Sequence, residues 1–264
     1  MGAVTRLRTE DIRLVDELTA NATAATTTQL LDGWLLRAAP GYPFRRCNSA
    51  LAYGGASIGL ETRIGMVEDF YAARGLPARF QVSPAALPVG LDDVLETRGY
   101  VIEEPTLVLV ADTARVVERT GRDAGAVTVG EGIDEYWVAE YASAFGDDET
   151  GRGRLRAYGH MLGHLGPAVA TAVLPIDETP AAVGLAVLER GWTGVYAMGT
   201  RREARRRGAA TAVLHALARW AHDGGAPRMY LQVEVTNDGA RQLYTRAAFE
   251  TAYRYHYRTR PSPA

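Results

Sequence analysis

Lysine is absent from this sequence of 264 residues, so all 29 basic side chains are arginines. Cysteine occurs once, as Cys47, which excludes a disulfide bond within the chain and fits a reducing compartment. No apolar run approaches the ~18 residues of a membrane span, and the first residues show no signal-peptide pattern. These absences argue against disulfide-stabilised and membrane-embedded proteins, and we expect a soluble protein of the cytoplasm.

A surplus of charge of one sign is missing as well. The formal net charge is -2, so the chain has no general attraction to nucleic acid or to anionic membranes. With 47% hydrophobic and 23% charged residues, the composition is that of an ordinary globular protein, and the length is typical of two domains. We therefore expect neither nucleic acid nor a membrane as a partner.

The most informative stretch runs from residue 194 to residue 211. Residues 194–200 read as a strand, and an arginine-rich segment follows. Gly208 then opens an alanine-rich helix whose apolar residues recur at helical spacing. These residues are Ala210, Val213, Leu214, Leu217, Ala218 and Ala221. The stretch therefore predicts a strand, a basic loop and the beginning of a helix.

The beginning of this helix is suited to an anionic phosphate. The first backbone N–H groups of a helix are unpaired and lie at the positive end of its dipole. Gly208 and the two alanines after it allow a ligand to approach the backbone closely. Arg205, Arg206 and Arg207 add positive charge at the same place.

A second strand–helix unit follows further along the chain. Residues 231–237 read as a strand that ends in Asn237, a favourable residue before a helix. The helix presents Ala240, Leu243, Tyr244 and Ala247 at core spacing, and Phe249 opens the next strand.

These two units resemble the signatures of the GNAT superfamily of N-acetyltransferases. Arg205-x-x-Gly208-x-Ala210 is similar to the pyrophosphate-binding motif of that family, and Asn237, Leu243-Tyr244 and Phe249 are similar to its second signature. The resemblance covers roughly residues 126–260, with Ala248 standing where relatives usually carry glycine. It implies an α/β (α+β) fold, in which helices flank a central mixed sheet and two parallel strands splay apart around acetyl-CoA.

The resemblance also implies the residues that bind acetyl-CoA. Backbone groups of Met198, Gly199 and Thr200 would pair with the pantetheine arm, and Asn237 and Ala240 would border its far side. The pyrophosphate would lie on the loop and first helical turn, formed by Arg205, Arg206, Arg207, Gly208, Ala209, Ala210 and Thr211. No metal site is expected.

Tyr244 matches the position of the family's usual general acid. A phenol with a pKa near ~10 stays protonated at neutral pH and can donate its proton to a departing thiolate. The alternative is a tyrosine that packs on an amphipathic helix. The general base does not carry over, because Gly194 and Gln232 stand at the matching positions. Glu234 lies on the same strand face as Gln232 and is the candidate substitute, with a solvated carboxylate as the alternative.

Two further segments have open interpretations. Asp147, Asp148 and Glu149 fall where the family shapes the acceptor pocket, and they would attract a cationic amine or form an ordinary polar loop. Tyr253, Tyr255 and Tyr257 of the final strand would line the acceptor site or pack at a sheet edge.

The two halves of the chain resemble each other. Gly75-Leu76-Pro77 with Gln81-Val82 corresponds to Gly225-Ala226-Pro227 with Gln232-Val233, in the same strand–helix–strand order. This favours a tandem repeat, with a degenerate GNAT-like domain at 1–120 and the catalytic domain at 121–264. The first copy has Val94-Leu95 where the second has Leu243-Tyr244, so it lacks the acid. We expect a polar linker at 112–126, a helix at 9–32, and paired strands at 33–37 and 45–51.

The leading hypothesis is an acetyl-CoA-dependent N-acetyltransferase that transfers the acetyl group by direct attack to a primary amine of a small molecule or amino acid. A peptide N-terminus is the second choice of acceptor. A non-catalytic regulator that binds acyl-CoA is the alternative from another class. Nucleic-acid binding through the arginines of the basic loop ranks third. A steep salt dependence of the affinity for DNA would reveal it. The acceptor, the acyl length, and the choice between monomer and homodimer stay open.

Overall fold

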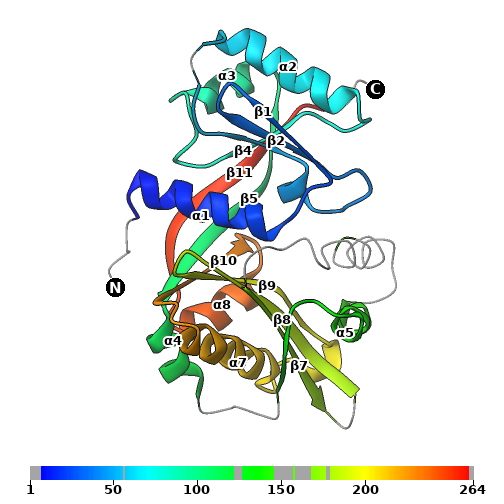
Figure 1. Cartoon of the computed structure of the whole chain (residues 1–264), viewed down its shortest axis with the longest axis vertical. Coiled ribbons are helices and arrows are strands. Elements are labelled where there is room, and N and C mark those ends of the chain that lie inside the picture. Colours follow the sequence, from blue (N-terminus) through cyan, green and yellow to red (C-terminus); the bar gives the residue numbers. More distant parts are fainter. Residues whose placement is uncertain are drawn as a thin grey trace. The chain divides into compact units, whose positions relative to one another are not determined.

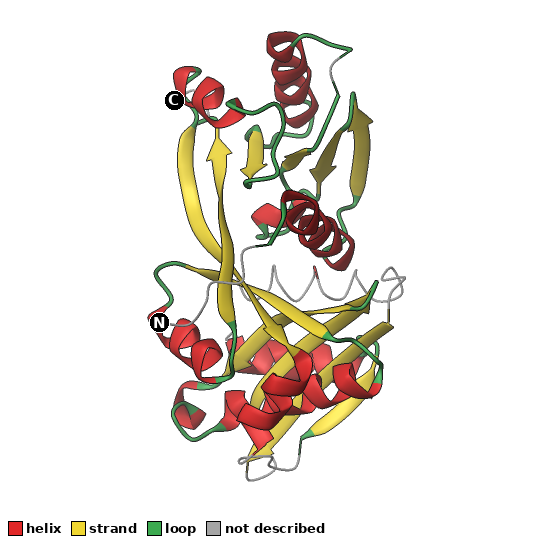
Figure 2. Cartoon of the chain, turned by 90° about the vertical axis from the view of Figure 1, so that its left-hand side faces the viewer, coloured by secondary structure: helices red, strands yellow, loops and turns green. Residues whose placement is uncertain are grey.

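The computed structural model describes residues 7–55, 57–121, 127–145, 157, 168–176 and 179–261. These form two compact units, the N-terminal unit (residues 7–107 and 253–261) and the C-terminal unit (residues 108–252). Each unit contains strands of a mixed sheet together with helices that pack on it (Figures 1 and 2). The predicted α/β class is confirmed.

The N-terminal unit is built on a sheet with the strand order β1-β2-β3-β4-β11-β5. Strands β1 to β3 are antiparallel neighbours, β3 and β4 are parallel, and β11 is antiparallel to β4. Its elements along the chain are α1 (Thr9–Ala22), β1 (Thr27–Leu31), β2 (Trp34–Ala38), η1 (Arg45–Cys47), β3 (Ala50–Ala52), α2 (Leu60–Ala72), β4 (Arg79–Val82), α3 (Leu91–Thr97) and β5 (Val101–Asp112). The strand β11 (Glu250–Thr259) comes from the end of the chain.

The core of this unit lies between α2, α3 and the sheet. Trp34 and Phe80 are fully buried and meet edge to face, with 5.5 Å between their ring centroids. Ile64 and Val67 of α2 and Leu95 of α3 belong to the same buried cluster. Edge-to-face contact is a favourable geometry for aromatic rings, and apolar burial of this kind stabilises the fold.

Two sequence predictions for this unit are wrong. The helix expected at 9–32 ends at Ala22, and the threonine-rich segment after it forms strand β1. Threonine is β-branched and favours strands, and a turn at Asp32 and Gly33, both with positive φ, joins β1 to β2. The strand expected at 45–51 is the short helix η1 followed by β3, because the Asn48 side chain bonds to the backbone of Ala39 and Phe44 and folds this loop.

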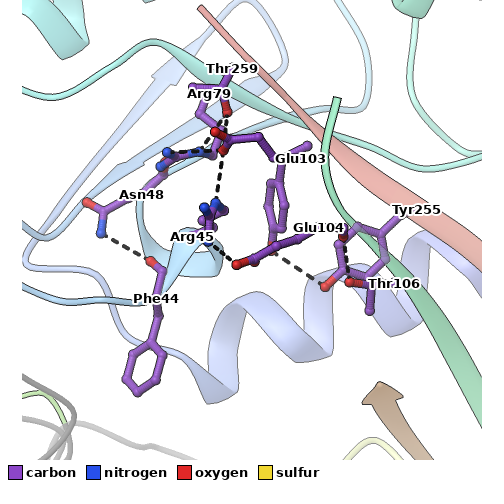
Figure 3. A network of polar contacts seen from close by, with 10 residues as sticks. Phe44, Arg45, Asn48, Arg79, Glu103, Glu104, Thr106, Tyr255 and Thr259 are labelled. Atoms are coloured by element: carbon purple, nitrogen blue, oxygen red, sulfur yellow. Dashed lines mark hydrogen bonds and ion pairs between the residues drawn. The ribbon is translucent and has the colours of Figure 1, made fainter. Parts of the chain in front are cut away.

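A polar network joins η1 to β5 and β11 inside the N-terminal unit (Figure 3). The Arg45 guanidinium donates a hydrogen bond to Glu103 at 2.9 Å and pairs with Glu104, which has a positive φ of 43°. Thr259 donates to the same Glu103 carboxylate at 2.8 Å and accepts from Arg79 at 3.0 Å. Because these groups satisfy one another, their charges are tolerated in a half-buried place.

The C-terminal unit has the strand order β5-β10-β9-β8-β7-β6. Strands β6 to β9 form an antiparallel series, and β9 and β10 are parallel. Its elements are α4 (Thr113–Thr120), β6 (Thr128–Glu131), α5 (Glu135–Phe145), β7 (Ala168–Ile176), β8 (Thr179–Glu189), β9 (Trp192–Thr200), η3 (Arg202–Ala204), α7 (Ala209–Asp223), β10 (Arg228–Glu234) and α8 (Asp238–Arg246).

Helix α7 lies across β7, β8 and β9 (Figure 1). Its buried residues include Val213, Leu214, Leu217 and Ala221, as the apolar spacing of the sequence predicts. The segment expected to be a linker contains helix α4, which the Asp112 carboxylate caps by accepting a hydrogen bond from the backbone N–H of Arg115 at 3.2 Å. The rest of the expected linker, from residue 122, lies outside the described residues.

Strands β5 and β11 each contribute residues to both units. The last seven residues of β11 belong to the N-terminal unit, where His256 pairs with Val82 and Thr259 with Arg79 of β4. The compact units therefore divide the chain at other positions than residue 120, and the domain limits given above stay a prediction. Tyr253, Tyr255 and Tyr257 are buried within the N-terminal unit, on a strand that lies between β4 and β5.

Among the described residues, no helix is both long and apolar enough to cross a membrane.

Candidate functional site

The parallel strands β9 and β10 separate at one edge of the C-terminal unit. They pair over four positions, from Arg228 and Trp192 to Leu231 and Val195. Beyond this last pair β9 continues to Thr200 and β10 to Glu234 without further pairing between them. Met198, Gly199 and Thr200, predicted to bind pantetheine, all lie in the part of β9 beyond the separation.

A β-bulge marks the place where β9 leaves β10. Ala197 has a positive φ of 52°, and the register of β9 with β8 shifts between Val183 and Leu185. A Cβ atom at Gly184 would come within 2.7 Å of the Met198 sulfur and of Val213 on α7, so only glycine leaves room for this packing. The Gly184 carbonyl also accepts a hydrogen bond at 3.1 Å from the Trp137 indole of α5.

The loop between β9 and α7 has the backbone geometry of an anion site. Arg206 and Gly208 both have positive φ, 61° and 82°, and Gly208 directly precedes the helix. The Gly208 carbonyl accepts the first intrahelical bond, from Ala212. Across the described part of the chain, no side chain accepts a hydrogen bond from the backbone N–H groups of residues 209–211. These N–H groups, at the positive end of the dipole, are the donors that a phosphate needs.

The three arginines before this helix are exposed. The guanidinium of Arg205 donates to the Thr200 carbonyl at 3.3 Å, which fixes its side chain against the end of β9. Arg206 and Arg207 are exposed in the same turn and add positive charge near the beginning of α7. The residue before the helix is Gly208, which has no side chain to cap the first N–H groups, and a cationic loop precedes it. This arrangement suits an anionic ligand.

Helix α8 begins where β10 ends. The Asn237 side chain accepts a hydrogen bond at 3.1 Å from the backbone N–H of Ala240, so its oxygen caps the helix. Tyr244 is only 6% exposed and packs edge to face on Phe249, with 5.8 Å between the ring centroids. Burial raises the pKa of the Tyr244 phenol well above its ordinary value, so this side chain stays protonated at neutral pH.

A pair of tyrosines occupies the strand face that contains Gly194 and Gln232, the two positions matched to the family's general base. The hydroxyl groups of Tyr196 and Tyr230 are 2.6 Å apart, and their rings meet edge to face. A Cβ atom at Gly194 would come within 2.6 Å of both rings. Gln232 is half-buried on the same face of β10, and Glu234 is exposed at the end of that strand. Sequence reasoning missed this pair, although a glycine inside a strand pattern is a signal of close packing.

The structure thus brings the predicted residues to one edge of the sheet, where β9, α7, β10 and α8 meet. Their parts in binding and catalysis stay predictions. The acidic segment at residues 147–149 lies outside the described residues. Within the described residues, no group of three histidine, cysteine or carboxylate side chains is arranged to hold a metal ion.

The chain matches a known family model over residues 9–258, nearly its whole length. That family is described as probable histone acetyltransferase Rv0428c C-terminal. A relative from Bacillus subtilis (strain 168), described as uncharacterized N-acetyltransferase YobR, is 29% identical over 253 residues, which cover 94% of this chain and 98% of the relative.

Solved structures show the same fold at low sequence identity. A GCN5-related N-acetyltransferase from Kribbella flavida has a TM-score of 0.70 at 15% identity, covering 98% of this chain and 97% of its own. A tandem GNAT protein from the clavulanic acid biosynthesis pathway has a TM-score of 0.66 at 13% identity, covering 94% of this chain and 89% of its own.

Proposed function

The chain belongs to the GNAT superfamily of N-acetyltransferases, and from that premise we propose that its C-terminal unit transfers an acetyl group from acetyl-CoA to a primary amine. The observation that carries the proposal is the separation of β9 from β10 directly beside the uncapped beginning of α7. Strand segments that do not pair with each other and the N–H groups of the first helical turn thus lie at the same edge of the sheet.

In this proposal the C-terminal unit holds acetyl-CoA mainly through its backbone. The β9 groups around Met198, Gly199 and Thr200 pair with the pantetheine arm, and the first N–H groups of α7 bind the pyrophosphate. Arg205, Arg206 and Arg207 neutralise its charge, and Asn237 and Ala240 border the far side of the arm. When bound, acetyl-CoA supplies an activated acetyl thioester.

Tyr244 serves as the general acid in the proposed reaction. Its phenol is protonated at neutral pH and can donate a proton to the sulfur that leaves, while burial, which raises its pKa, makes it a weaker acid than an exposed tyrosine. Edge-to-face packing against Phe249 restricts its ring. Glu234 stays the candidate base of the sequence prediction, and its exposure means that it would have to act through water.

A direct test is thiol release from acetyl-CoA, followed with DTNB across amines, amino acids, aminoglycosides and short peptides. We expect acceptor-dependent release, and about a 100-fold lower kcat with Tyr244→Phe at similar CoA affinity. The phenylalanine variant keeps the ring and removes only the proton that the acid would donate. No thiol release with any acceptor, together with measurable CoA binding, would favour the alternative of a non-catalytic acyl-CoA-binding regulator.

The acceptor we favour is a small molecule or an amino acid. A protein or peptide amine is the second candidate, because the matching family is described as a probable histone acetyltransferase. Including a lysine-containing histone peptide and a peptide with a free N-terminus in the panel decides between these acceptors.

A further inference from the structure

Helix α5 is anchored beside the β-bulge at which β9 leaves β10. It packs on β8 and β9, and the Trp137 indole donates its hydrogen bond at 3.1 Å to the carbonyl of Gly184 in the bulge. A Cβ atom at Gly184 would lie 2.7 Å from the sulfur of Met198 on β9. Tyr141 stacks on Trp137 with 5.3 Å between the ring centroids, and both rings are almost fully buried. The part of α5 that carries these rings is therefore fixed against the bulge.

Glu140 belongs to the same part of α5. Residues three positions apart on a helix are neighbours on its surface, so Glu140 lies next to Trp137. The residue is half-buried, and its Oε2 atom is buried without a hydrogen-bond partner. Within the part of the chain that the structure describes, no other side-chain carboxylate oxygen is both buried and without a partner.

The strands on which α5 packs offer this carboxylate no cation. No residue of β7, β8 or β9 is an arginine or a histidine. Their titratable side chains are Tyr196 and Glu189, and Glu189, at the end of β8, lies 3.4 Å from Arg190. On α5 itself, Glu135 and Tyr136 are exposed. A buried carboxylate oxygen without a donor is costly, which favours a donor that arrives with a ligand.

The proposed reaction supplies a donor of this kind. An aliphatic amine with a pKa of about 10.4 is almost entirely protonated at neutral pH, so it carries N–H donors and a positive charge. Its nitrogen must lose a proton before it can attack a thioester. A carboxylate beside the bulge can bind the ammonium group and take that proton.

Resting on the function proposed above, we propose that Glu140 is the catalytic base, in the role predicted from the sequence for Glu234. Its Oε2 atom accepts a hydrogen bond from the acceptor ammonium and takes one proton from it. The neutral nitrogen forms the C–N bond to the acetyl carbon as the C–S bond breaks, and it releases a second proton to water. Tyr244 gives its proton to the departing thiolate. Solvent then removes the proton from Glu140 and restores that of Tyr244.

The test uses the intact chain and the panel amine that the wild type acetylates best. Glu140→Gln keeps the size of the side chain and removes its basicity, and Glu135→Gln is the matched control at an exposed residue of the same helix. At a pH two units below the pKa of the amine, where about 1% of it is neutral, we expect Glu140→Gln to lower kcat/KM about 100-fold. Glu135→Gln should stay within about twofold of the wild type.

The pH dependence distinguishes a base from a group that only shapes the site. Glu140→Gln can use only the neutral amine, so its kcat/KM should rise about tenfold per pH unit up to the pKa of the amine, while that of the wild type changes little. The loss should therefore shrink to a few-fold where half of the amine is neutral. An equal loss at every pH would overturn the proposal, as would this pH dependence in Glu234→Gln instead of Glu140→Gln.

Thermal unfolding gives a readout that needs no acceptor. Because the Oε2 atom has no partner to lose, the Tm of Glu140→Gln should equal or exceed that of the wild type. A Tm lowered by about 5 °C or more would mean that the carboxylate stabilises the fold, and the proposal would be wrong. If the wild type acetylates no amine at all, the proposed function is contradicted and the assignment of Glu140 falls with it.

Discussion

The two units of this chain differ at the beginning of the helix that follows the first parallel strand. In the C-terminal unit, α7 begins after exposed arginines, and none of the described side chains caps the N–H groups of residues 209–211. In the N-terminal unit, the Asp32 carboxylate accepts hydrogen bonds from the backbone of Ser57 and Ile58 just before α2. Arg63 of α2 lies 3.3 Å from the same carboxylate. The chain itself therefore supplies the anion at the beginning of α2.

The openings between the parallel strands differ in the same sense. After β3 pairs with β4 at Leu51, the backbone N–H of Leu87 donates to the Ala52 carbonyl at 2.7 Å. Ser83, directly after β4, donates at 2.6 Å to the buried Asp16 of α1. The N-terminal unit thus uses its own groups where we propose that the C-terminal unit uses acetyl-CoA. A repeated fold can lose a ligand site by filling it as well as by losing residues.

The largest effect is expected when α7 is given an internal anion like that of α2. Gly208→Asp should weaken CoA binding by at least roughly 100-fold, because a carboxylate would compete with the pyrophosphate for the helix N–H groups. Isothermal titration with CoA measures this. Gly208→Asn has a side chain of the same size at the same positive φ and is the uncharged control, for which we expect a clearly smaller loss.

The stoichiometry of the same titration shows whether the N-terminal unit also binds CoA. We expect one CoA per chain in the wild type and none in Gly208→Asp. A second CoA in the wild type, or one that persists in the variant, would mean that the N-terminal unit binds CoA despite Asp32.

The next largest effect concerns the internal anion itself. Asp32→Ala should lower the Tm on the order of 5 °C, because the buried Arg63 loses its carboxylate partner. Hydrogen bonds from Ser57 and Ile58 lower the pKa of Asp32, so its contribution is present above the unfolded pKa of about 4 and is lost as pH falls below it. Thermal unfolding at pH 7 and pH 3 checks both points. Equal Tm values for the variant and the wild type at pH 7 would contradict them.

An effect of opposite sign with pH is expected at Asp16. Burial raises its pKa from 3.8 to about 6, so the folded protein binds this proton more tightly than the unfolded chain does. The stabilisation is full below pH 4 and is lost as pH rises through 6, by on the order of 3 kcal/mol. We compare urea unfolding of the wild type and Asp16→Asn at pH 4.5 and pH 7. The wild type should lose stability relative to the variant as pH rises, and an unchanged difference would refute this.

The smallest effects are expected at the exposed arginines before α7. Arg206→Gln and Arg207→Gln should each weaken CoA binding by about two- to fivefold, since exposed charges are screened by water and salt. The loss should shrink when the salt concentration rises from 50 to 500 mM. A loss of the same size at both salt concentrations would mean a direct contact rather than general attraction.

Much of the C-terminal unit was predictable because its signals are local. The apolar spacing of α7, Gly208 before it and Asn237 before α8 each act within a few residues, and the elements form where these signals placed them. The tyrosine pair at Tyr196 and Tyr230 was not predictable, because it depends on the register of two strands that are far apart in the sequence.

In the N-terminal unit the errors have a similar cause. The helix from Thr9 ends at Ala22, where the Arg37 guanidinium donates to the carbonyl groups of Ala20 and Thr23. Arg37 lies on β2, so this end of the helix is specified from outside the local sequence. Likewise, the Asp32 carboxylate that bonds to the backbone before α2 lies in the turn between β1 and β2, 25 residues earlier in the chain than Ser57.

The place of β11 in the N-terminal sheet has a consequence for synthesis on the ribosome. Residues 256–259 of β11 pair with β4, and β11 lies between β4 and β5, so a sheet begun by the first hundred residues is completed only after the C-terminal unit has been translated. The N-terminal unit therefore cannot reach its final fold while residues 253–259 are still in the exit tunnel. A nascent chain that stops before residue 253 leaves an open strand edge at β4, which invites aggregation.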